Sequence, residues 1–506
     1  MCGIYGFVGN SDASKNIIEG LRRLEYRGYD SWGISVIKNN EIVTVKNTIL
    51  LNEVKDSSIK SLSGSTIGIG HNRWATHGGV TINNAHPHYS TDKSFVLAQN
   101  GIVENYQELK KKLILKGYNF ITQTDTEVIV RLVESKLTKT TDLKEALRLA
   151  FLDLEGRNTV ILLSLKNNQI ISIRNGSPLV VGLGKHEIFF ASDTLSFADK
   201  AEKVIYMNDL EMAENVGDKV HLYDVKNGKE LKIKEHKITD ANSDINHDGY
   251  DHFMLKEIVE QKDTIKAAVA YSEEELKPIL DALKKAKHVY TIGAGTASFA
   301  AGMIAYYLRK HANINVTELR SYEVESYIHL FNKGDLLIAV SQSGETADTI
   351  EAIELAKKKG VKIASIVNMM GSTITRISDL PYFTRSGPEI CVASTKAFTA
   401  QCAWGLLVAL TAVGKYKEVR KDIHSLSESL ENYFTDKKFE EIKAVAKKIK
   451  NKEHFFVLGR GQNYYISLEG SLKVKEITYK HFEGFAGGEL KHGVIALIEK
   501  DTPVFV

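Results

Sequence analysis

The chain has 506 residues, a length that accommodates three or four domains of ordinary size. Hydrophobic residues make up 43% and charged residues 25% of it, the balance of a soluble globular protein. The formal net charge of +3 gives no electrostatic reason to expect nucleic acid or a membrane surface as a partner. The three cysteines, Cys2, Cys391 and Cys402, are too few for a disulfide-built secreted fold, and no segment is apolar enough for a membrane span, so we expect a cytoplasmic protein.

Short β-type runs and helical patterns alternate through the first 233 residues. The runs rich in Val, Ile and Phe predict strands at 4–8, 33–37, 66–70, 95–98 and 159–165. Helical periodicity predicts helices at 15–24, 105–113 and 126–135, and the pair Thr124 and Asp125 predicts a cap for the third. Strands and helices mixed in this way predict a layered α/β sheet domain.

Residues 234–252 are dominated by polar and turn-forming residues and predict a linker. Helical periodicity resumes at 253–269. We therefore expect a first domain at 1–233 and a second region from 253 onward.

An internal repeat follows the linker. Residues 287–295 match residues 453–461 at an offset of 166, and the same offset aligns 335–340 with 501–506. Both segments are apolar strands, and the first opens into a glycine-bearing turn and a helix. The pattern predicts two doubly wound α/β units, at 253–420 and 421–506.

The glycines of the repeat do not complete a dinucleotide fingerprint. The position of the third glycine is Ser298 in the first copy and Tyr464 in the second. We therefore expect no nicotinamide or other redox cofactor.

Cys2 is a candidate nucleophile because it follows the initiator Met directly. Removal of Met would leave a thiol and a free α-amine on one residue, and an α-amine with a pKa of roughly 7.7–8 can act as a local base. The alternative is a small apolar residue that begins an edge strand. Residues elsewhere in the chain favour the nucleophile: Arg73 and His77 lie on one short loop, and Asn100 with Gly101 offers the donors of an oxyanion hole.

These segments resemble the glutaminase half of the N-terminal-nucleophile amidotransferases, which has a layered αββα fold. The resemblance rests on Cys-Gly-Ile at 2–4, Arg-Trp-Ala-Thr-His-Gly at 73–78, Ala-His-Pro-His at 85–88 and the motif at 21–30. It implies that Cys2 attacks the side-chain amide of L-glutamine and that Asn100 and Gly101 stabilise the oxyanion. The residues that would hold the two ends of glutamine are Arg73, Thr76, His77 and Asp125.

One residue departs from this pattern, because Gln99 stands where the family usually has His. The histidines of this region also raise the question of a metal, but no Cys-x-x-Cys or His-Glu-x-x-His spacing accompanies them, and we expect none.

The loop at 341–349 lies between an apolar strand and a helix, where a parallel sheet binds anions. A plain helix cap is the alternative reading of Ser343 alone. The loop resembles the signature of sugar isomerase domains, which segments 295–296 and 392–401 also match, although Ala297 replaces a family Ser. The resemblance implies that the phosphate of D-fructose 6-phosphate and its sugar are bound by Thr296, Ser341, Gln342, Ser343, Thr346, Val392 and Ser394.

A third set of residues predicts isomerase chemistry. Lys473 and Glu476 are three apart on an expected helix at 471–479, where a surface ion pair is the simpler reading. The motifs Lys-x-Lys-Glu and Glu-Leu-Lys-His-Gly resemble the sugar isomerase set, although Val494 replaces a family Pro. The resemblance implies that Glu476 moves a proton between adjacent carbons, His492 opens the ring and Lys473 assists.

Taken together, the chain resembles the glutamine–fructose-6-phosphate amidotransferases along its whole length. This resemblance implies D-glucosamine 6-phosphate and L-glutamate as products, the first step of hexosamine biosynthesis. It also implies an ammonia channel gated by Trp74 and a homodimer, because the residue matching His492 reaches the neighbouring subunit's site in the family. A phosphoribosyl pyrophosphate amidotransferase is the rival enzyme, and the sugar isomerase repeat argues against it.

The second copy of the repeat is shorter than the first. At the offset of 166, Val506 aligns with Val340, where the phosphate loop of the first copy begins. The family has a further C-terminal part with a Schiff-base lysine, so we expect a C-terminally truncated chain that hydrolyses glutamine at most. A catalytically incomplete glutaminase or a sugar-phosphate-binding protein therefore stays open as the alternative function.

Overall fold

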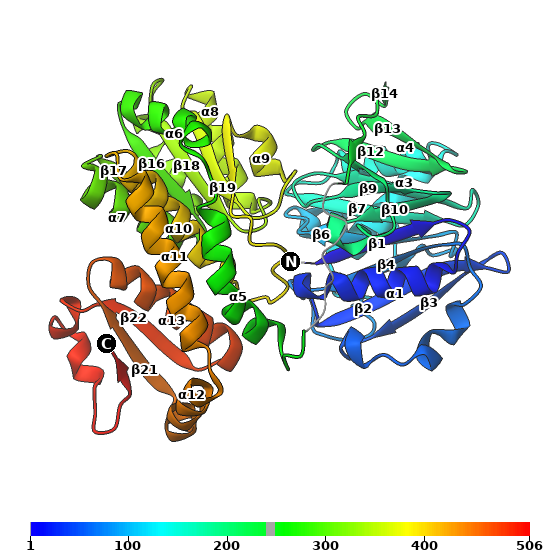
Figure 1. Cartoon of the computed structure of the whole chain (residues 1–506). Helices are drawn as coiled ribbons and strands as arrows, with labels where there is room; N and C mark the ends of the chain where they lie inside the picture. The colour runs from blue at the N-terminus through cyan, green and yellow to red at the C-terminus, as the bar shows by residue number, and fades with distance from the viewer. Residues whose placement is uncertain (1, 239–247) are drawn as a thin grey trace. The chain divides into compact units, whose positions relative to one another are not determined.

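The computed structural model describes residues 2–238 and 248–506, and the chain divides into two compact units, Met1–Asp244 and Ile245–Val506 (Figure 1). The division falls within the expected linker at 234–252, of which residues 239–247 lie outside the described residues. In the part of the chain that the structure describes, no helix combines the length and hydropathy needed to cross a membrane.

Two antiparallel sheets form the body of the first unit. The eight-stranded sheet has the order β15 (His236–Lys237), β11 (Lys203–Tyr206), β9 (Val180–Gly184), β10 (Glu187–Ala191), β1 (Gly3–Val8), β4 (Ile67–Arg73), β2 (Ser31–Lys38) and β3 (Glu41–Asn47). The seven-stranded sheet has the order β14 (Glu230–Leu231), β13 (Lys219–Asp224), β12 (Glu211–Val216), β8 (Gln169–Arg174), β7 (Asn158–Ser164), β6 (Phe95–Gly101) and β5 (His88–Tyr89).

The alternation of side chains along these strands produces three apolar layers. On β1, Tyr5 and Phe7 pack against helix α1 (Ala13–Arg23), whereas Ile4 points between the two sheets. The outer face of the second sheet is covered by helices α2 (Tyr106–Leu115), α3 (Thr126–Leu137) and α4 (Leu143–Phe151). The predicted layered αββα arrangement is therefore confirmed.

The cap predicted for α3 is wrong in one respect. Asp125 has helical dihedral angles (φ −67°, ψ −26°) and makes no side-chain capping bond, because its carboxylate accepts the N–H of Val103 at 2.8 Å instead. The hydroxyl of Thr124 accepts the N–H of Glu127 at 3.4 Å. The carboxylate of Asp125 therefore anchors the segment after β6 and does not cap α3.

A parallel five-stranded sheet organises the second unit. Its order is β17 (Val316–Arg320), β16 (Val289–Gly293), β18 (Leu336–Ser341), β19 (Lys362–Val367) and β20 (Leu380–Phe383). One face packs on α5 (Phe253–Ala268), α6 (Glu273–Lys285), α7 (Thr296–Ala312), α10 (Lys396–Thr411) and α11 (Tyr416–Tyr433). The other face packs on η5 (Ser321–Leu330), α8 (Ala347–Lys358) and α9 (Thr373–Ile377).

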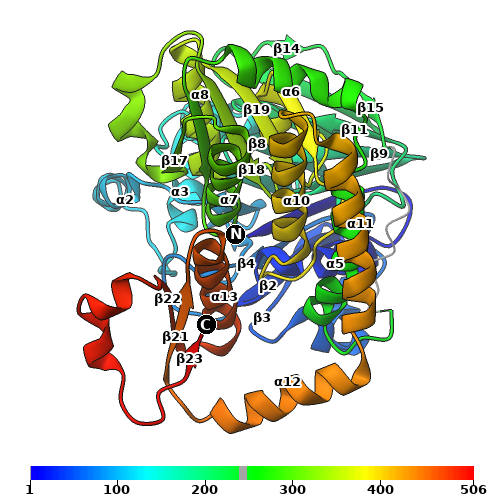
Figure 2. The same cartoon turned by 60° about the vertical axis from the view of Figure 1, so that its left-hand side comes forward.

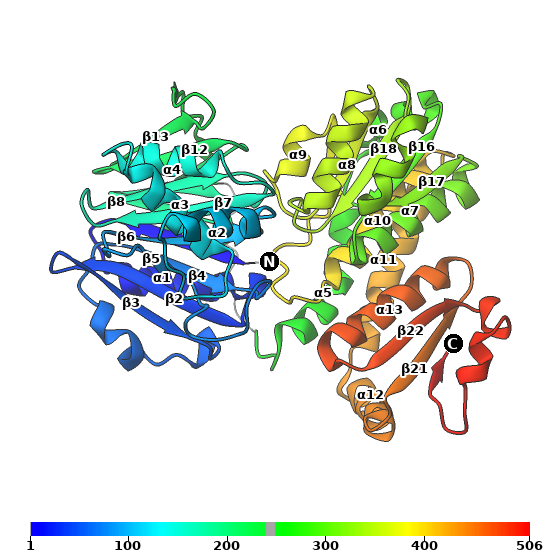
Figure 3. The same cartoon turned by 180° about the vertical axis from the view of Figure 1, so that it is seen from behind.

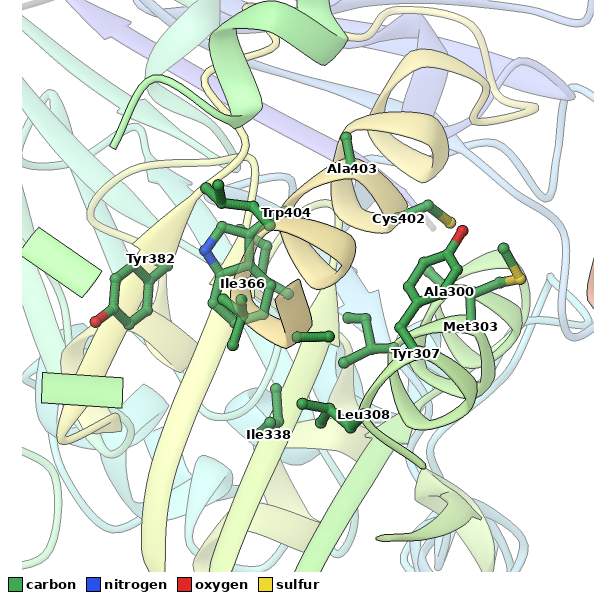
Figure 4. Close-up of a cluster of buried hydrophobic side chains, with 14 of the residues drawn as sticks. Ala300, Met303, Tyr307, Leu308, Ile338, Ile366, Tyr382, Cys402, Ala403 and Trp404 are labelled. Carbon is green, nitrogen blue, oxygen red and sulfur yellow. The ribbon is translucent and has the colours of Figure 1, made fainter. Parts of the chain in front are cut away.

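Figure 4 shows the first of these two cores. Trp404 of α10 and Leu308 of α7 lie over Ile338 and Ile366 of the sheet, and all four are buried. A sheet buried on both faces explains why its strands read as nearly continuous apolar runs. The doubly wound unit predicted from the repeat is confirmed.

The second copy of the repeat has a three-stranded parallel sheet, in the order β22 (His481–Ala486), β21 (His454–Gly459) and β23 (Val504–Phe505). Helix α12 (Asp436–Ile449) leads into it from α11, as Figure 2 shows, and has no buried residue. Helix α13 (Gln462–Thr478) lies against β21 and β22 (Figure 3) and also contacts α7. Gly302 permits this contact, because a Cβ there would lie 2.2 Å from the ring of Tyr465.

Candidate functional site

Cys2 immediately precedes the buried strand β1, and its sulfur lies against the loop that follows β4. The N–H of Trp74 donates to Sγ at 3.2 Å. Burial raises the pKa of the Cys2 thiol, and the Trp74 N–H and the Arg73 guanidinium oppose that rise. The resting thiol is therefore protonated and needs a base to become a nucleophile.

The amide of Asn100, at the end of β6, lies beside Cys2. Its Nδ2 donates to the backbone oxygen of Cys2 at 3.1 Å and to Oγ of Ser192 at 3.0 Å. The next residue, Gly101, has φ 112°, and a Cβ there would lie 2.0 Å from the carbonyl oxygen of Arg157. The backbone conformation at this position therefore requires glycine.

Arg73 shapes the loop that carries the predicted glutamine-binding residues. Its buried guanidinium donates to the carbonyl oxygens of His77 and of Gly79, the latter at 3.2 Å. Nδ1 of His77 is 4.0 Å from the carboxylate of Asp125 and 3.4 Å from the hydroxyl of Thr76. The structure thus brings Arg73, Thr76, His77 and Asp125 together beside the Cys2 loop.

Trp74, the predicted channel gate, is 38% exposed. Its indole meets the ring of Tyr29 edge-on, with centroids 5.5 Å apart. The structure therefore places this side chain on the surface of the first unit, next to the backbone that contacts Cys2.

In the second unit, the predicted phosphate loop connects β18 to α8. Ser341 is buried, and its Oγ accepts the N–H of Gly344 at 2.9 Å. The same Oγ is 3.2 Å from Oγ1 of Thr346. Oγ of Ser343 accepts the N–H of Glu345. Gly344 has φ 64°, and a Cβ there would lie 2.0 Å from Oγ of Ser372. The loop ends at the N-terminus of α8, where Thr346 is the N-cap residue and the helix dipole favours a negative charge, so the loop has the geometry of an anion site.

Gln342 and Thr296 complete this region. The carbonyl oxygen of Gln342 accepts the N–H groups of Asn368 and Met369 at 3.1 and 3.2 Å, which fixes the loop to the end of β19. Thr296 begins α7 and donates its hydroxyl to the carboxylate of Glu469 on α13 at 3.2 Å. This hydrogen bond links the two copies of the repeat.

The isomerase set is partly assembled. Nζ of Lys473 lies 2.7 Å from the carboxylate of Glu476 and 3.7 Å from that of Glu469. Burial raises the pKa of Glu469 to about 7. His492 is exposed between two 3₁₀ turns, η6 (Glu489–Lys491) and η7 (Val494–Leu497), and among the described residues no ion pair joins it to Glu476, whose partner is Lys473.

Two buried carboxylates hold the loop that carries Val392 and Ser394. The hydroxyl of Ser394 donates to Glu389 at 2.6 Å, and Val392 is 48% exposed. Glu257 of α5 accepts the N–H groups of Ile390 and Cys391, the latter at 3.0 Å. The hydroxyl of Ser394 is therefore used to order its own loop in this structure.

Sequence reasoning missed the residues that support the predicted ones. Glu257 and Glu469 are buried acids on helices α5 and α13, where the sequence resembles that of any charged helix surface, and Glu389 is a buried acid in the loop before α10. His71 is one of several histidines in its region, together with His77, His86 and His88. Glu257, Glu469 and His71 act through partners distant in the sequence, so no local pattern identifies them. Glu389 instead accepts the hydroxyl of Ser394, five residues further along the chain.

Two models of known protein families match parts of the chain. A model described as a glutamine amidotransferase domain matches residues 71–199, and a model described as an SIS domain matches residues 282–411 and 448–506. The two SIS segments correspond to the two copies of the repeat. The chain is therefore a glutamine amidotransferase domain followed by SIS-type sheets.

Relatives of known name match along the full chain. The glutamine–fructose-6-phosphate aminotransferase (isomerizing) of Pyrococcus horikoshii is 40% identical over 517 residues, covering 100% of this chain and 85% of the relative. The enzyme of the same name from Haemophilus influenzae is 40% identical over 532 residues, with the same coverage. The solved C-terminal domain of glucosamine-fructose-6-phosphate aminotransferase from Francisella tularensis is 34% identical, covers 52% of this chain and 77% of that one, and has a TM-score of 0.45. The chain belongs to the family of isomerizing glutamine–fructose-6-phosphate aminotransferases.

Proposed function

We propose that the protein transfers the amide nitrogen of L-glutamine to D-fructose 6-phosphate, giving D-glucosamine 6-phosphate and L-glutamate. This reaction is the first step of hexosamine biosynthesis. The observation that carries the proposal is the placement of Cys2, whose backbone oxygen lies 3.1 Å from the amide nitrogen of Asn100 and whose sulfur contacts the Arg73 loop.

In the glutaminase half, the thiol of Cys2 attacks the amide carbon of glutamine. Its proton passes to the α-amine that becomes free when Met1 is removed, since an α-amine titrates near neutrality. The amide of Asn100 and the N–H of Gly101 stabilise the tetrahedral oxyanion. The α-ammonium group passes this proton to the amide nitrogen, so the C–N bond breaks and ammonia leaves. Water then hydrolyses the glutamyl thioester to glutamate and regenerates the thiol.

The ends of glutamine are bound by the loop beside Cys2. Arg73 pairs with the α-carboxylate, and Asp125 pairs with the α-ammonium group. Thr76 and His77 complete the pocket from the same loop. The indole of Trp74 gates the passage of ammonia from this site.

In the sugar half, the N-terminus of α8 and the hydroxyls of Ser341, Ser343 and Thr346 bind the phosphate without a charged clamp. Gln342 and Thr296 extend this site, and Val392 and Ser394 line its sugar side. Glu476 moves the proton between adjacent carbons, with Lys473 paired to it, and His492 opens the ring.

The proposed domain division is a glutaminase at 1–233, a linker at 234–252 and sugar isomerase units at 253–420 and 421–506. We further propose a cytoplasmic homodimer. Pairing of two chains would allow the exposed His492 of one chain to serve the site of the other.

The test is glutamate release by purified protein and by Cys2→Ala, with Cys391→Ala as the matched control. Cys2→Ala should lose activity by orders of magnitude, because no other residue replaces a covalent nucleophile, and its circular dichroism should be unchanged. Cys391→Ala should release glutamate at the wild-type rate. Full activity in Cys2→Ala would refute the proposal.

A further inference from the structure

A buried histidine lies directly behind the amide of Asn100. His71, on β4 of the first sheet, is 0% exposed, and its Nε2 reaches across to β6 of the second sheet. Nε2 is 3.0 Å from the carbonyl oxygen of Gln99 and 3.0 Å from Oδ1 of Asn100. Both of these atoms accept hydrogen bonds, so both contacts are satisfied only if Nε2 carries the proton.

Two further observations fix the same tautomer. Burial lowers the pKa of His71 to about 3, so the ring is neutral and holds a single proton. Nδ1 of His71 is buried and has no hydrogen-bond partner among the described residues. A proton on Nδ1 would leave a buried donor unpaired, which is costly.

The orientation of the Asn100 amide follows from this tautomer. With Oδ1 facing the N–H of His71, Nδ2 faces Cys2 and Ser192. A rotation of the amide by 180° would set Nδ2 against the N–H of His71 and Oδ1 against the carbonyl oxygen of Cys2. Two attractive contacts would become repulsive ones.

A second chain of hydrogen bonds keeps the ring in place. The amide of Gln99 accepts the hydroxyl of Thr126 at 2.6 Å and donates to Oδ1 of Asn158 at 2.8 Å. Because that hydroxyl is used as a donor, it must accept its 3.0 Å contact from Nε2 of His86. The rings of His86 and His71 then lie with their centroids 4.3 Å apart.

We propose that His71 is a positioning residue for glutamine hydrolysis, which as the Nε2–H tautomer holds the Asn100 amide with Nδ2 toward Cys2 and Ser192. The inference rests on the proposed function, because it assigns Asn100 the role of oxyanion donor. His71 itself touches neither substrate nor nucleophile and acts through Asn100 alone.

The matched pair of variants is His71→Gln and His71→Met. Gln carries an N–H donor near the position of Nε2, whereas Met has a similar length and no donor. His71→Met should lower kcat for glutamate release by about 100- to 1000-fold, the range for loss of one oxyanion donor, with KM for glutamine within about threefold. His71→Gln should recover most of that loss. Equal losses in two folded variants would overturn the proposal.

The third arm is a double-mutant cycle with Asn100→Ala. If His71 acts only through Asn100, His71→Met should add nothing to the loss caused by Asn100→Ala. If the double variant instead loses activity by the product of the two single-variant losses, His71 acts independently of Asn100, and the proposal is overturned.

Nitrogen NMR of ¹⁵N-histidine-labelled protein tests the tautomer in the unmutated chain, with His71→Gln to assign the signal. We expect a proton on Nε2 throughout about pH 5–9, because burial keeps this ring from titrating in that range. A proton on Nδ1 would overturn the proposal even if His71→Met failed to fold. Absence of glutamate release by the wild type would instead refute the proposed function.

Discussion

The buried carboxylate of Glu257 gives a stability prediction that can be worked out from the structure. Glu257 lies on α5, is 2% exposed, and accepts the N–H groups of Ile390 and Cys391 on one oxygen. Burial chiefly raises the pKa of Glu257 from 4.5 to about 7, with the negative charge of Glu389 adding to the rise and Lys396 opposing it. Glu257→Gln keeps the accepting oxygen and removes the charge.

The sign of the effect follows from proton linkage. Because the pKa of Glu257 is higher in the folded state, the native protein holds a proton that the unfolded chain has lost between pH 4.5 and about 7. Stability is therefore lost as pH rises through this window. The rise in the pKa of Glu257 from 4.5 to about 7 corresponds to a loss of about 3 kcal/mol of stability at pH 8 and of less than about 1 kcal/mol at pH 5.

Glu257→Gln should therefore stabilise the second unit by up to about 3 kcal/mol at pH 8 and change it little at pH 5. Urea unfolding, read by pulse proteolysis of second-unit fragments at both pH values, measures the difference. Glu351→Gln, at an exposed position on α8, is the control and should have no pH-dependent effect. An equal effect of Glu257→Gln at the two pH values, or a loss at pH 8, would refute the reasoning.

Two further predictions concern the second unit. Replacing Ser343 and Thr346 with Ala should weaken fructose 6-phosphate binding at least about tenfold through the loss of hydroxyl contacts to a charged group, with glutamine binding unchanged. Calorimetric titration checks both affinities, and unchanged sugar binding would show that the loop is only a helix cap. Gly302→Ala would place a Cβ 2.2 Å from the ring of Tyr465 and should lower the free energy of unfolding by about 1–3 kcal/mol. Gly470→Ala, where nothing lies within 4 Å, should instead raise it by up to about 1 kcal/mol, and similar urea midpoints for both variants would contradict this packing argument.

The helices and strands that the sequence predicted each have a local signature. The strand expected at 159–165 is β7 (Asn158–Ser164), and the helix expected at 253–269 is α5 (Phe253–Ala268). The order of strands within the two antiparallel sheets could not be predicted, since pairs such as β1 with β10 join residues nearly two hundred positions apart. The parallel sheet could be predicted because the repeat contains an apolar strand followed by a glycine-bearing turn and a helix, a pattern typical of doubly wound sheets.

The residues of the candidate site also differ in whether a local motif identifies them. The sequence identified residues such as Cys2, Asn100 and Lys473, which belong to local motifs. It did not predict that the hydroxyl of Thr296 would meet Glu469, because that contact depends on the packing of α7 against α13. Nor did it predict that His71 would orient Asn100, because the two lie on different sheets.

The central claim, that Cys2 is the nucleophile of a glutaminase, is tested most directly by covalent labelling. The protein is treated with a glutamine analogue that carries an electrophilic side chain, and the modified peptide is located by mass spectrometry. We expect a single adduct on Cys2, on a chain that has lost Met1, and its formation should slow when excess glutamine is added. Labelling of Cys391 or Cys402 instead, or labelling that glutamine does not slow, would contradict the assignment.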